Sequence, residues 1–163
     1  MIVSLFSFRR AYEIVGMQAA DAAAVHRLHA EHFARPWSDG EFVSLLSQVT
    51  VFGHVVRLVG AGEDDIAGFV LARAAGGEAE ILSLAVSGAH TRLGLGWRLM
   101  NSALREAHGR GALAMFLEVD EANRAAIALY HRLGFVVTGR RKDYYHVAEG
   151  KRSSALVMRC DLI

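Results

Sequence analysis

The sequence predicts an α+β domain whose central sheet is mixed but mostly antiparallel and is flanked by helices. Three strand-like runs, at residues 50–59, 66–75 and 78–86, are separated only by short glycine-containing turns, as in an antiparallel meander. A helical pattern over 95–108 then connects the third run to a further strand at 113–119, so these two strands must lie parallel. Two parallel strands at the centre of such a sheet can diverge and leave a slot for a ligand.

The full predicted order is β-α-α-β-β-β-α-β-α-β-β. It begins with a strand at 12–15 and a helix over 19–33. The helix is predicted because Ala22, Val25, Leu28, His29 and His32 recur at helical spacing. Pro36 then interrupts the chain. Ser38 and Glu41 form a capping-box pattern, which predicts a second helix from residue 39 to about 47.

The second half of the chain continues the alternation. The helix over 95–108 is expected to bury one stripe of side chains, made of Leu95, Leu99, Ala103, Leu104 and Ala107. A helix over 123–133 ends at Gly134, the expected glycine after a helix C-terminus. The last strands are expected at 135–139 and 155–161, and the polar segment between them reads as a connection with a turn at 149–150.

Length and composition indicate one soluble domain. The 163 residues are 53% hydrophobic and 21% charged, enough for a single core. The net charge of +1 argues against a direct nucleic-acid binder. The sequence has one cysteine, Cys160, so it cannot form an internal disulfide, and this suits a reducing cytoplasm. Cys160 lies in an apolar run, which favours a buried strand residue over a nucleophile.

The N-terminus and the apolar runs bear on localisation. Residues 1–10 are apolar and then basic, the reverse of a signal peptide, so they read as an extension before a single domain over 11–163. No apolar run has the length needed to cross a bilayer. We therefore expect a cytoplasmic protein without a membrane partner.

A glycine loop stands between the strand that ends at Val86 and the helix that begins near Leu95. Gly94 and Gly96 allow backbone N–H groups to converge, and the helix N-terminus adds the positive end of its dipole, which suits a pyrophosphate. The spacing alone also occurs at plain tight turns. The loop is not a P-loop, because no Gly-Lys-Ser/Thr follows, nor a dinucleotide fingerprint, because Leu99 replaces the third glycine.

Three segments together carry a resemblance to a known family. They are the loop at 92–96, the strand end Leu117-Glu118-Val119 and the run 123–135, which reads Asn-x-x-Ala-Ile-x-Leu-Tyr-x-x-Leu-Gly-Phe. With these segments the chain resembles the GNAT acyltransferases. With the segment 35–38 and the pair Tyr144-Tyr145 it is similar, within them, to the RimI-type ribosomal-protein alanine N-acetyltransferases.

The resemblance, which covers about residues 12–162, implies a GNAT fold and acetyl-CoA as co-substrate. It implies contacts to the coenzyme from Leu84, Ala85, Val86, Thr91, Arg92, Leu93, Gly94, Leu95, Gly96 and Asn123. Thr91 departs from the family pattern, in which Gln or Arg usually stands there, although Arg92 keeps a cation nearby. Asn123 is either a helix N-cap, a contact to the pantetheine arm, or both.

Acyl transfer to an amine needs a proton acceptor for the amine and a proton donor for the leaving thiolate. Glu118 is the expected base, because partial burial at a strand end would strengthen it. Glu80 on the neighbouring strand is the substitute, and the alternative for Glu118 is a solvent-facing carboxylate. Tyr130, two helical turns beyond Asn123, is the general acid that the resemblance implies, whereas an aromatic residue at this spacing is by itself more often part of the core.

The resemblance implies as acceptor a protein N-terminus, most specifically the N-terminal alanine of ribosomal small-subunit protein 18. An α-amino group has a pKa of about 8 and lysine about 10.4, so an N-terminus reaches the neutral form at lower cost. Arg35, Trp37, Tyr144 and Tyr145 are expected to wall a peptide groove, and packing on the sheet edge is the alternative for the aromatic residues. Three other acceptors remain open: another peptide, a lysine or a small amine. A non-catalytic acyl-CoA sensor is the alternative to an enzyme.

One histidine series has the composition of a metal site. His26, His29 and His32 repeat every three residues, and histidines on one helix can ligate zinc. A series at this spacing drifts around the helix, so the three side chains cannot meet one ion. We therefore expect no metal and partly exposed helix histidines.

Overall fold

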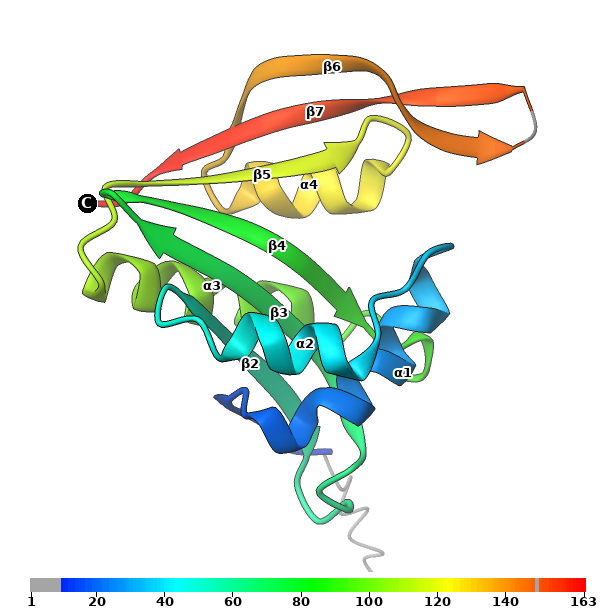
Figure 1. Cartoon of the computed structure of the whole chain (residues 1–163), viewed down its shortest axis with the longest axis vertical. Coiled ribbons are helices and arrows are strands. Elements are labelled where there is room, and N and C mark those ends of the chain that lie inside the picture. Colours follow the sequence, from blue (N-terminus) through cyan, green and yellow to red (C-terminus); the bar gives the residue numbers. More distant parts are fainter. Residues whose placement is uncertain (1–9, 149) are drawn as a thin grey trace, which may run out of the picture.

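The computed structural model describes residues 10–148 and 150–163, and Arg10 is the only described residue of the expected N-terminal extension. Its centre is a seven-stranded sheet in the order β1-β2-β3-β4-β5-β7-β6, with helices against both faces (Figure 1). The order of helices and strands is the predicted one, with two short 3-10 turns added, at Ala19–Asp21 and Gly88–His90. The α+β prediction is confirmed.

The elements have the following bounds. The N-terminal half contains β1 (Tyr12–Gly16), α1 (Ala22–His32), α2 (Asp39–Leu46), β2 (Val51–Leu58), β3 (Ile66–Ala75) and β4 (Glu78–Val86). The C-terminal half contains α3 (Leu95–Gly109), β5 (Ala114–Asp120), α4 (Arg124–Arg132), β6 (Val136–Ala148) and β7 (Lys151–Asp161). Strands β2 to β4 form the predicted antiparallel meander. Strand β1 pairs antiparallel with β2, and β5 pairs with β4 in parallel.

Local signals in the sequence fix several element ends. The backbone N–H of Glu41 donates to Ser38 Oγ at 3.1 Å, and the N–H of Ser38 donates to Glu41 Oε2 at 2.6 Å, which confirms the capping box at the start of α2. Gly134 follows α4 with φ 97°, the left-handed conformation expected after a helix C-terminus.

Two hydrophobic clusters occupy the two faces of the sheet. Helix α3 buries Leu95, Leu99, Ala103 and Ala107 as expected, together with Met100, while Leu104 is half-buried. The second cluster, under α1 and α2, is built around Phe42, Phe69 and Val25. Cys160 is buried in β7, as its apolar surroundings predicted.

Strands β4 and β5 diverge soon after they meet. Their pairing comprises three residue pairs, from Glu78 with Ala114 to Glu80 with Phe116, and beyond these pairs the two strands separate (Figure 1). A β-bulge at Leu82 accompanies the separation, because Ile81 pairs with Ala72 and Ser83 with Leu71. The expected slot between parallel strands is therefore present in the backbone.

The C-terminal hairpin is longer than the sequence analysis predicted. The segment expected to be a polar connection belongs to β6 and β7, which run antiparallel almost to their turn at Gly150. Its polarity has a simple cause: β6 is the outer strand of the sheet, and its residues from Arg140 to Tyr144 are exposed. An edge strand with polar residues on both faces lacks the alternation from which strands are recognised.

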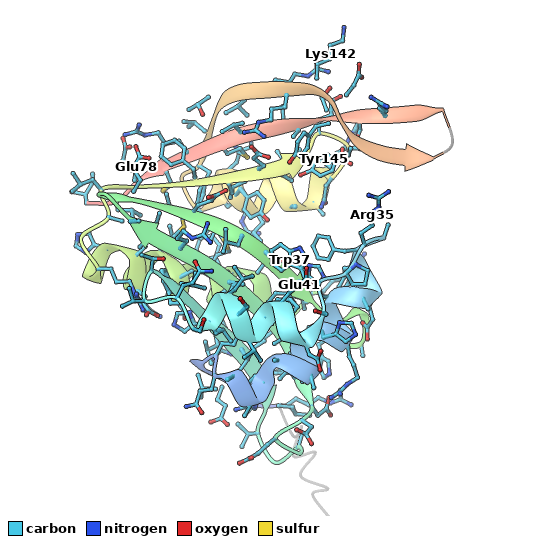
Figure 2. The ribbon with its side chains drawn as sticks, viewed as in Figure 1. Arg35, Trp37, Glu41, Glu78, Lys142 and Tyr145 are labelled. Atoms are coloured by element: carbon cyan, nitrogen blue, oxygen red, sulfur yellow. The ribbon has the colours of Figure 1, made fainter. Side chains whose placement is uncertain are left out.

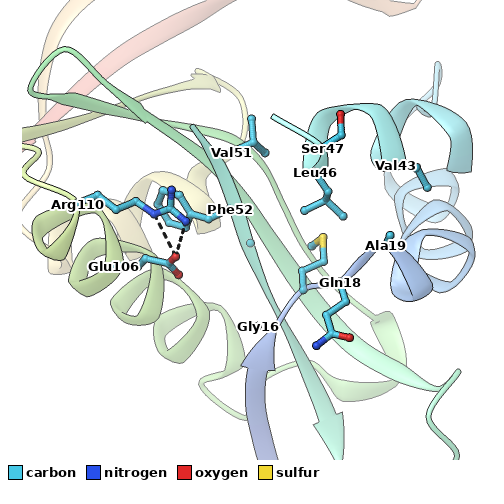
Figure 3. Close-up of a pocket in the computed structure, with 12 residues that line it drawn as sticks. Gly16, Gln18, Ala19, Val43, Leu46, Ser47, Val51, Phe52, Glu106 and Arg110 are labelled. Atoms are coloured by element: carbon cyan, nitrogen blue, oxygen red, sulfur yellow. Dashed lines mark hydrogen bonds and ion pairs between the residues drawn. The ribbon is translucent and has the colours of Figure 1, made fainter. Parts of the chain in front are cut away.

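A separate hollow of about 360 Å³ lies between α2, β2 and the end of α3 (Figure 3). There Glu106 accepts two hydrogen bonds from Arg110, at 3.1 and 2.9 Å, and pairs with His54 of β2 at 3.0 Å. These contacts tie α3 to the sheet. No helix of the described residues is long and apolar enough to cross a membrane.

Candidate active site

The diverging strands open onto a cavity of about 460 Å³. We call it the slot. Its walls come from the end of α1, from β4 and β5, from the start of α4 and from β6. The lining residues are His32, Phe33, Ala34, Ile81, Leu82, Ser83, Leu84, Leu117, Glu118, Val119, Asp120, Asn123, Tyr130 and Tyr145. The slot thus gathers, from five elements, several of the residues singled out in the sequence.

Glu118 reaches the slot from β5, the strand that separates from β4. Leu117 and Val119 point into the core beneath α3 and α4, so Glu118 faces the opposite side of β5. Its side chain is 26% exposed, and its Oε1 lies 3.0 Å from Nη2 of Arg141. The carboxylate is therefore accessible from the slot and paired with one guanidinium.

Tyr130 enters the slot from α4, on the other side of the sheet from Glu118. Its ring packs against Phe135, with centroids 5.9 Å apart, and the residue is only 7% exposed. Burial, with a smaller contribution from Tyr145, raises the pKa of Tyr130 to about 12. The phenol therefore stays protonated at neutral pH and can donate a hydrogen bond.

The two tyrosines of the hairpin occupy different positions. Tyr145 lines the slot, and its pKa is raised by burial and then by the charge of Glu118. Tyr144 is exposed and lies edge-on to Tyr145, with ring centroids 5.0 Å apart. Figure 2 shows Arg35, on the loop after α1, on the side of the molecule that faces this hairpin.

One margin of the slot is a strand edge. From Ile81 to Val86, β4 pairs with β3 on one side and has left β5 on the other, so its backbone groups on that side face the slot. Leu84 and Asn123 line the slot near this edge. Asn123 Oδ1 also accepts a hydrogen bond from the N–H of Ala126 at 3.2 Å, so it is the N-cap of α4.

The N-terminus of α3 lies next along the chain from β4. Gly94 is its N-cap with φ 72°, and Arg92 before it has φ 61°, so the loop turns through two left-handed residues. The first intrahelical bond runs from the N–H of Arg98 to the carbonyl of Gly94, and the N–H groups of residues 95–97 precede it. Such a loop can cradle an anion.

Gly96 allows α3 to approach α4 closely. A Cβ at this position would lie 3.2 Å from Leu129 Cδ2, tighter than ordinary van der Waals contact. Thr91 and Leu93 are exposed on the same loop, and Thr91 Oγ1 lies 3.5 Å from the carbonyl of Gly88. The free edge of β4 thus leads along the chain from the slot to the N-terminus of α3.

Two predicted site residues lie elsewhere. Trp37 stacks on His29, with centroids 5.0 Å apart, and packs against the cluster beneath α1 and α2 rather than lining the slot. Glu80 is exposed at the paired end of β4, where it lines a different hollow beside Phe116. The structure thus brings Glu118, Tyr130, Asn123 and Tyr145 together but leaves Trp37 and Glu80 outside.

The three histidines of α1 differ from one another. The expectation of partly exposed side chains is wrong for His29, which is 3% exposed and surrounded by aromatic rings of the second cluster. His26 is half-buried and His32 is exposed beside the slot. Within residues 10–148 and 150–163, no three His, Cys, Asp or Glu side chains gather as metal ligands do.

Sequence reasoning missed part of the slot wall. His32, Phe33 and Ala34 follow the end of α1, and a usable signal was an aromatic residue just before the break at Pro36. Ser83 was missed as well. It is 6% exposed, and its Oγ has no hydrogen-bond partner among the described residues, an arrangement that no local pattern announces.

Comparison with known proteins identifies this architecture. Residues 22–135 match the model of the acetyltransferase (GNAT) family. The chain belongs to the GNAT family. Its GNAT relatives include the ribosomal protein bS18-alanine N-acetyltransferase of Escherichia coli, 31% identical over 89% of this chain and 94% of the relative. The N-alpha-acetyltransferase RimI of Mycobacterium tuberculosis is 31% identical over 91% of each chain.

Solved GNAT structures agree with the fold. The crystal structure of the E. coli ribosomal-protein-S18-alanine N-acetyltransferase matches with a TM-score of 0.83 at 28% identity, covering 93% of this chain and 94% of that one. Arabidopsis thaliana NAA60 in complex with acetyl-CoA shares the fold, with a TM-score of 0.81 at 16% identity and coverage of 93% and 99%. The chain is therefore a RimI-type GNAT enzyme, an N-acetyltransferase that uses acetyl-CoA.

Proposed function

We propose that this enzyme acetylates the α-amino group of a protein N-terminus in the cytoplasm, and that its acceptor is the N-terminal alanine of ribosomal protein bS18. The observation that carries the proposal is the match to a bS18-alanine N-acetyltransferase over 94% of that relative's length. A match over nearly the whole length includes both the coenzyme half and the acceptor half of the fold. The slot supports it, because a carboxylate and a phenol meet there from opposite sides of the sheet.

In the proposed reaction the amine attacks the thioester carbonyl carbon from the side of Glu118. A carbon–nitrogen bond forms, the carbon–sulfur bond breaks, and Glu118 takes the proton that the amine loses. The departing sulfur lies on the side of Tyr130. A thiol has a pKa of about 8.5, well below that of the Tyr130 phenol, so Tyr130 stabilises the departing thiolate by donating a hydrogen bond. The proton that Glu118 took from the amine reaches the thiolate through water, and the coenzyme leaves as the thiol.

Acetyl-CoA fits the free margin of β4 and the N-terminus of α3. The backbone of Leu84 to Val86 would hydrogen-bond the pantetheine amides as a neighbouring strand does. The N–H groups at Gly94 to Gly96, with Arg92 nearby, would hold the pyrophosphate. Asn123 adds an amide beside the arm, and Thr91 and Leu93 border the loop.

The acceptor peptide would lie between the loop after α1 and the β6–β7 hairpin. Arg35 and Tyr145 lie on two segments that face each other (Figure 2), and Tyr144 packs edge-on against Tyr145. Trp37 contributes indirectly, because its contacts with His29 hold the loop that carries Phe33 against α1. An N-terminus suits the site because its amine has a pKa of about 8, so a carboxylate base suffices.

The test compares three acceptors with acetyl-CoA. They are a peptide with the bS18 N-terminal sequence, the same peptide with a blocked α-amino group and an internal lysine, and a small polyamine. We expect thiol release and a mass gain of one acetyl group with the first peptide alone. Equal turnover of the blocked peptide or the polyamine would contradict the proposal. Acetyl-CoA binding by calorimetry without turnover of any amine would favour a non-catalytic sensor.

A further inference from the structure

Glu118 has a cationic partner before any acceptor arrives. Its Oε1 is 3.0 Å from Nη2 of Arg141, and the same guanidinium lies over the Tyr144 ring, 5.4 Å from the centroid. In the proposed reaction this carboxylate must take a proton from the amine. An oxygen that accepts a hydrogen bond from the guanidinium is occupied when the amine arrives. The ion pair and the reaction therefore compete for the same oxygen atoms.

A distortion of the hairpin brings Arg141 to this position. Arg141 pairs with Ala155 and Tyr145 with Ser153, so four steps along β6 oppose two along β7. Asp143, inside this bulge, has φ 54°, and its N–H donates to Ser154 Oγ at 3.1 Å. Bulges re-aim side chains. Here the bulge lies between Arg141, which contacts Glu118, and Tyr145, which lines the slot.

The exposure of the two side chains indicates that the ion pair between Arg141 and Glu118 opens easily. The side chain of Arg141 is 57% exposed and that of Glu118 26%. The pair between Arg57 and Asp21 is more enclosed, with side chains 21% and 9% exposed. Exposed pairs contribute little net stability because water and salt screen them. An ammonium group entering the slot can therefore replace Arg141 at small cost.

We propose that Arg141 holds the place of the acceptor's α-ammonium group. On binding, the ammonium displaces the guanidinium from Glu118. The ammonium proton passes to the carboxylate and on to water, so that the neutral amine can attack and Glu118 can take the second proton as the amide forms. The number of positive charges beside Glu118 is the same before and after displacement. Arg141 is thus a positioning residue that acts through Glu118, and the inference rests on the proposed function.

Glu118 has several other titratable neighbours, and a pH test must allow for them. Asp120 follows it on β5, Tyr145 comes from β6, Tyr130 from α4, and His32 lines the slot from the end of α1. Of these groups, Tyr145 also feels Arg141: burial raises the pKa of Tyr145 and the charge of Arg141 lowers it, so loss of Arg141 moves this pKa further upward and away from the acid limb. A shift specific to Arg141 therefore reports the loss of its own charge.

The test is the pH dependence of acetyl transfer to the bS18 peptide by the wild type, Arg141→Gln and Arg141→Lys. The profile of kcat/KM reports the free enzyme, whereas that of kcat reports the complex with bound acceptor. In Arg141→Gln we expect the acid limb of kcat/KM to move upward by about half a pH unit, the scale of an exposed ion pair. We expect the acid limb of kcat to stay in place and KM for the peptide to fall about threefold. Arg141→Lys keeps the charge and should stay close to the wild type.

Arg140→Gln is the matched control. Arg140 is the neighbouring residue, and it pairs with Glu121 at 3.0 Å with a similarly exposed side chain. This variant should keep the wild-type profiles. Thermal unfolding of the Arg141 variants should match that of the wild type, which separates the pH effect from misfolding.

Four results would overturn the inference. An equal shift of the kcat limb would mean that Arg141 stays paired with Glu118 during turnover, and the absence of any shift would mean that the pair has no role. The same shift in Arg140→Gln would reveal only a general charge effect of the hairpin. A Glu118→Gln variant with wild-type kcat would remove the proposed base and the inference together, whereas the first three results leave the proposed function intact.

Discussion

The imidazole of His29 accepts a hydrogen bond from the backbone N–H of Trp37 at 3.1 Å and stacks on the Trp37 indole, with ring centroids 5.0 Å apart. The carbonyl of Trp37 is 2.7 Å from Nδ1 of His26, which must carry the proton of that bond. Two histidines of α1 thus hold both backbone polar groups of one residue, and they do so in opposite tautomers. The loop that carries Phe33 and Ala34 to the slot depends on this arrangement.

Acidification is expected to destabilise the fold through His29. Burial, with the charges of His26 and His32 adding to it, lowers the pKa of His29 below 6.5. The unfolded chain therefore binds more protons than the native one, so stability is full above pH 6.5 and is lost as the pH falls below it. We expect Tm to fall by about 2–4 °C between pH 7.5 and 5.5, measured by calorimetry.

A His29→Asn variant is the control for this effect. Its amide oxygen can accept the bond from Trp37 but does not titrate in this range. The fall in Tm should be smaller in the variant, although not zero, because burial also lowers the pKa of His54. An unchanged pH dependence in His29→Asn would assign the effect to other groups.

Glu118→Gln is expected to lower kcat about 100-fold or more, because the amide cannot take the amine proton. Peptide KM and Tm should change little, since the side chain is partly exposed and keeps its shape. Glu80→Gln is the matched control and should have wild-type activity, because Glu80 lies at the paired end of β4. If Glu80→Gln lost most of its kcat while Glu118→Gln stayed active, Glu80 and not Glu118 would be the base.

Tyr130→Phe is expected to lower kcat about 100-fold with little change in KM for acetyl-CoA, because only the donor to the leaving sulfur is removed. The ring that packs on Phe135 remains, so Tm should be preserved. Steady-state kinetics at pH 7.5 measures the loss. The wild type should show no loss of activity from ionisation of this phenol below pH 10, because the pKa of Tyr130 is about 12. Wild-type kcat in the variant would leave Tyr130 as a core aromatic.

Gly94→Ala is expected to weaken acetyl-CoA binding about tenfold, the scale of one lost hydrogen bond to a charged group. Gly94 has φ 72°, and an L-residue there costs about 1–2 kcal/mol unless the loop rearranges. Gly60→Ala is the control, because Gly60 has φ 88° in the turn after β2 and likewise open space around it. Both variants should lose similar stability, and only Gly94→Ala should raise the Kd measured by calorimetry.

Much of this fold followed from short-range signals. The capping box at Ser38, the glycine at residue 134 and the short turns of the meander each act over a few residues, so the sequence alone placed α2, α4 and β2 to β4 within one or two residues of their ends. Parallel pairing of β4 and β5 followed from the intervening helix. The β6–β7 hairpin did not follow, because an exposed edge strand carries no apolar alternation.

The candidate site was predictable only where a motif spans it. Glu118, Asn123 and Tyr130 lie within 13 consecutive residues and meet in the slot. Phe33 and Ser83 reach the slot through long-range packing, which no local pattern encodes. Trp37 is the opposite case, because it belongs to a motif but does not line the slot. It packs on α1, where the His29 ring stacks on its indole and His29 Nδ1 accepts a hydrogen bond from its backbone N–H.

The early separation of β4 from β5 gives the sheet two interior edges in addition to its outer ones at β1 and β6. An outer edge invites another strand, and hence aggregation, whereas these two edges face each other inside one molecule. In the proposed complex, an extended arm of the coenzyme would pair with main-chain groups of one interior edge, and those groups are the same whatever the side chains are. The side chains of β4 are therefore constrained by the core, where Ala79, Ile81 and Ala85 are buried, more than by the ligand.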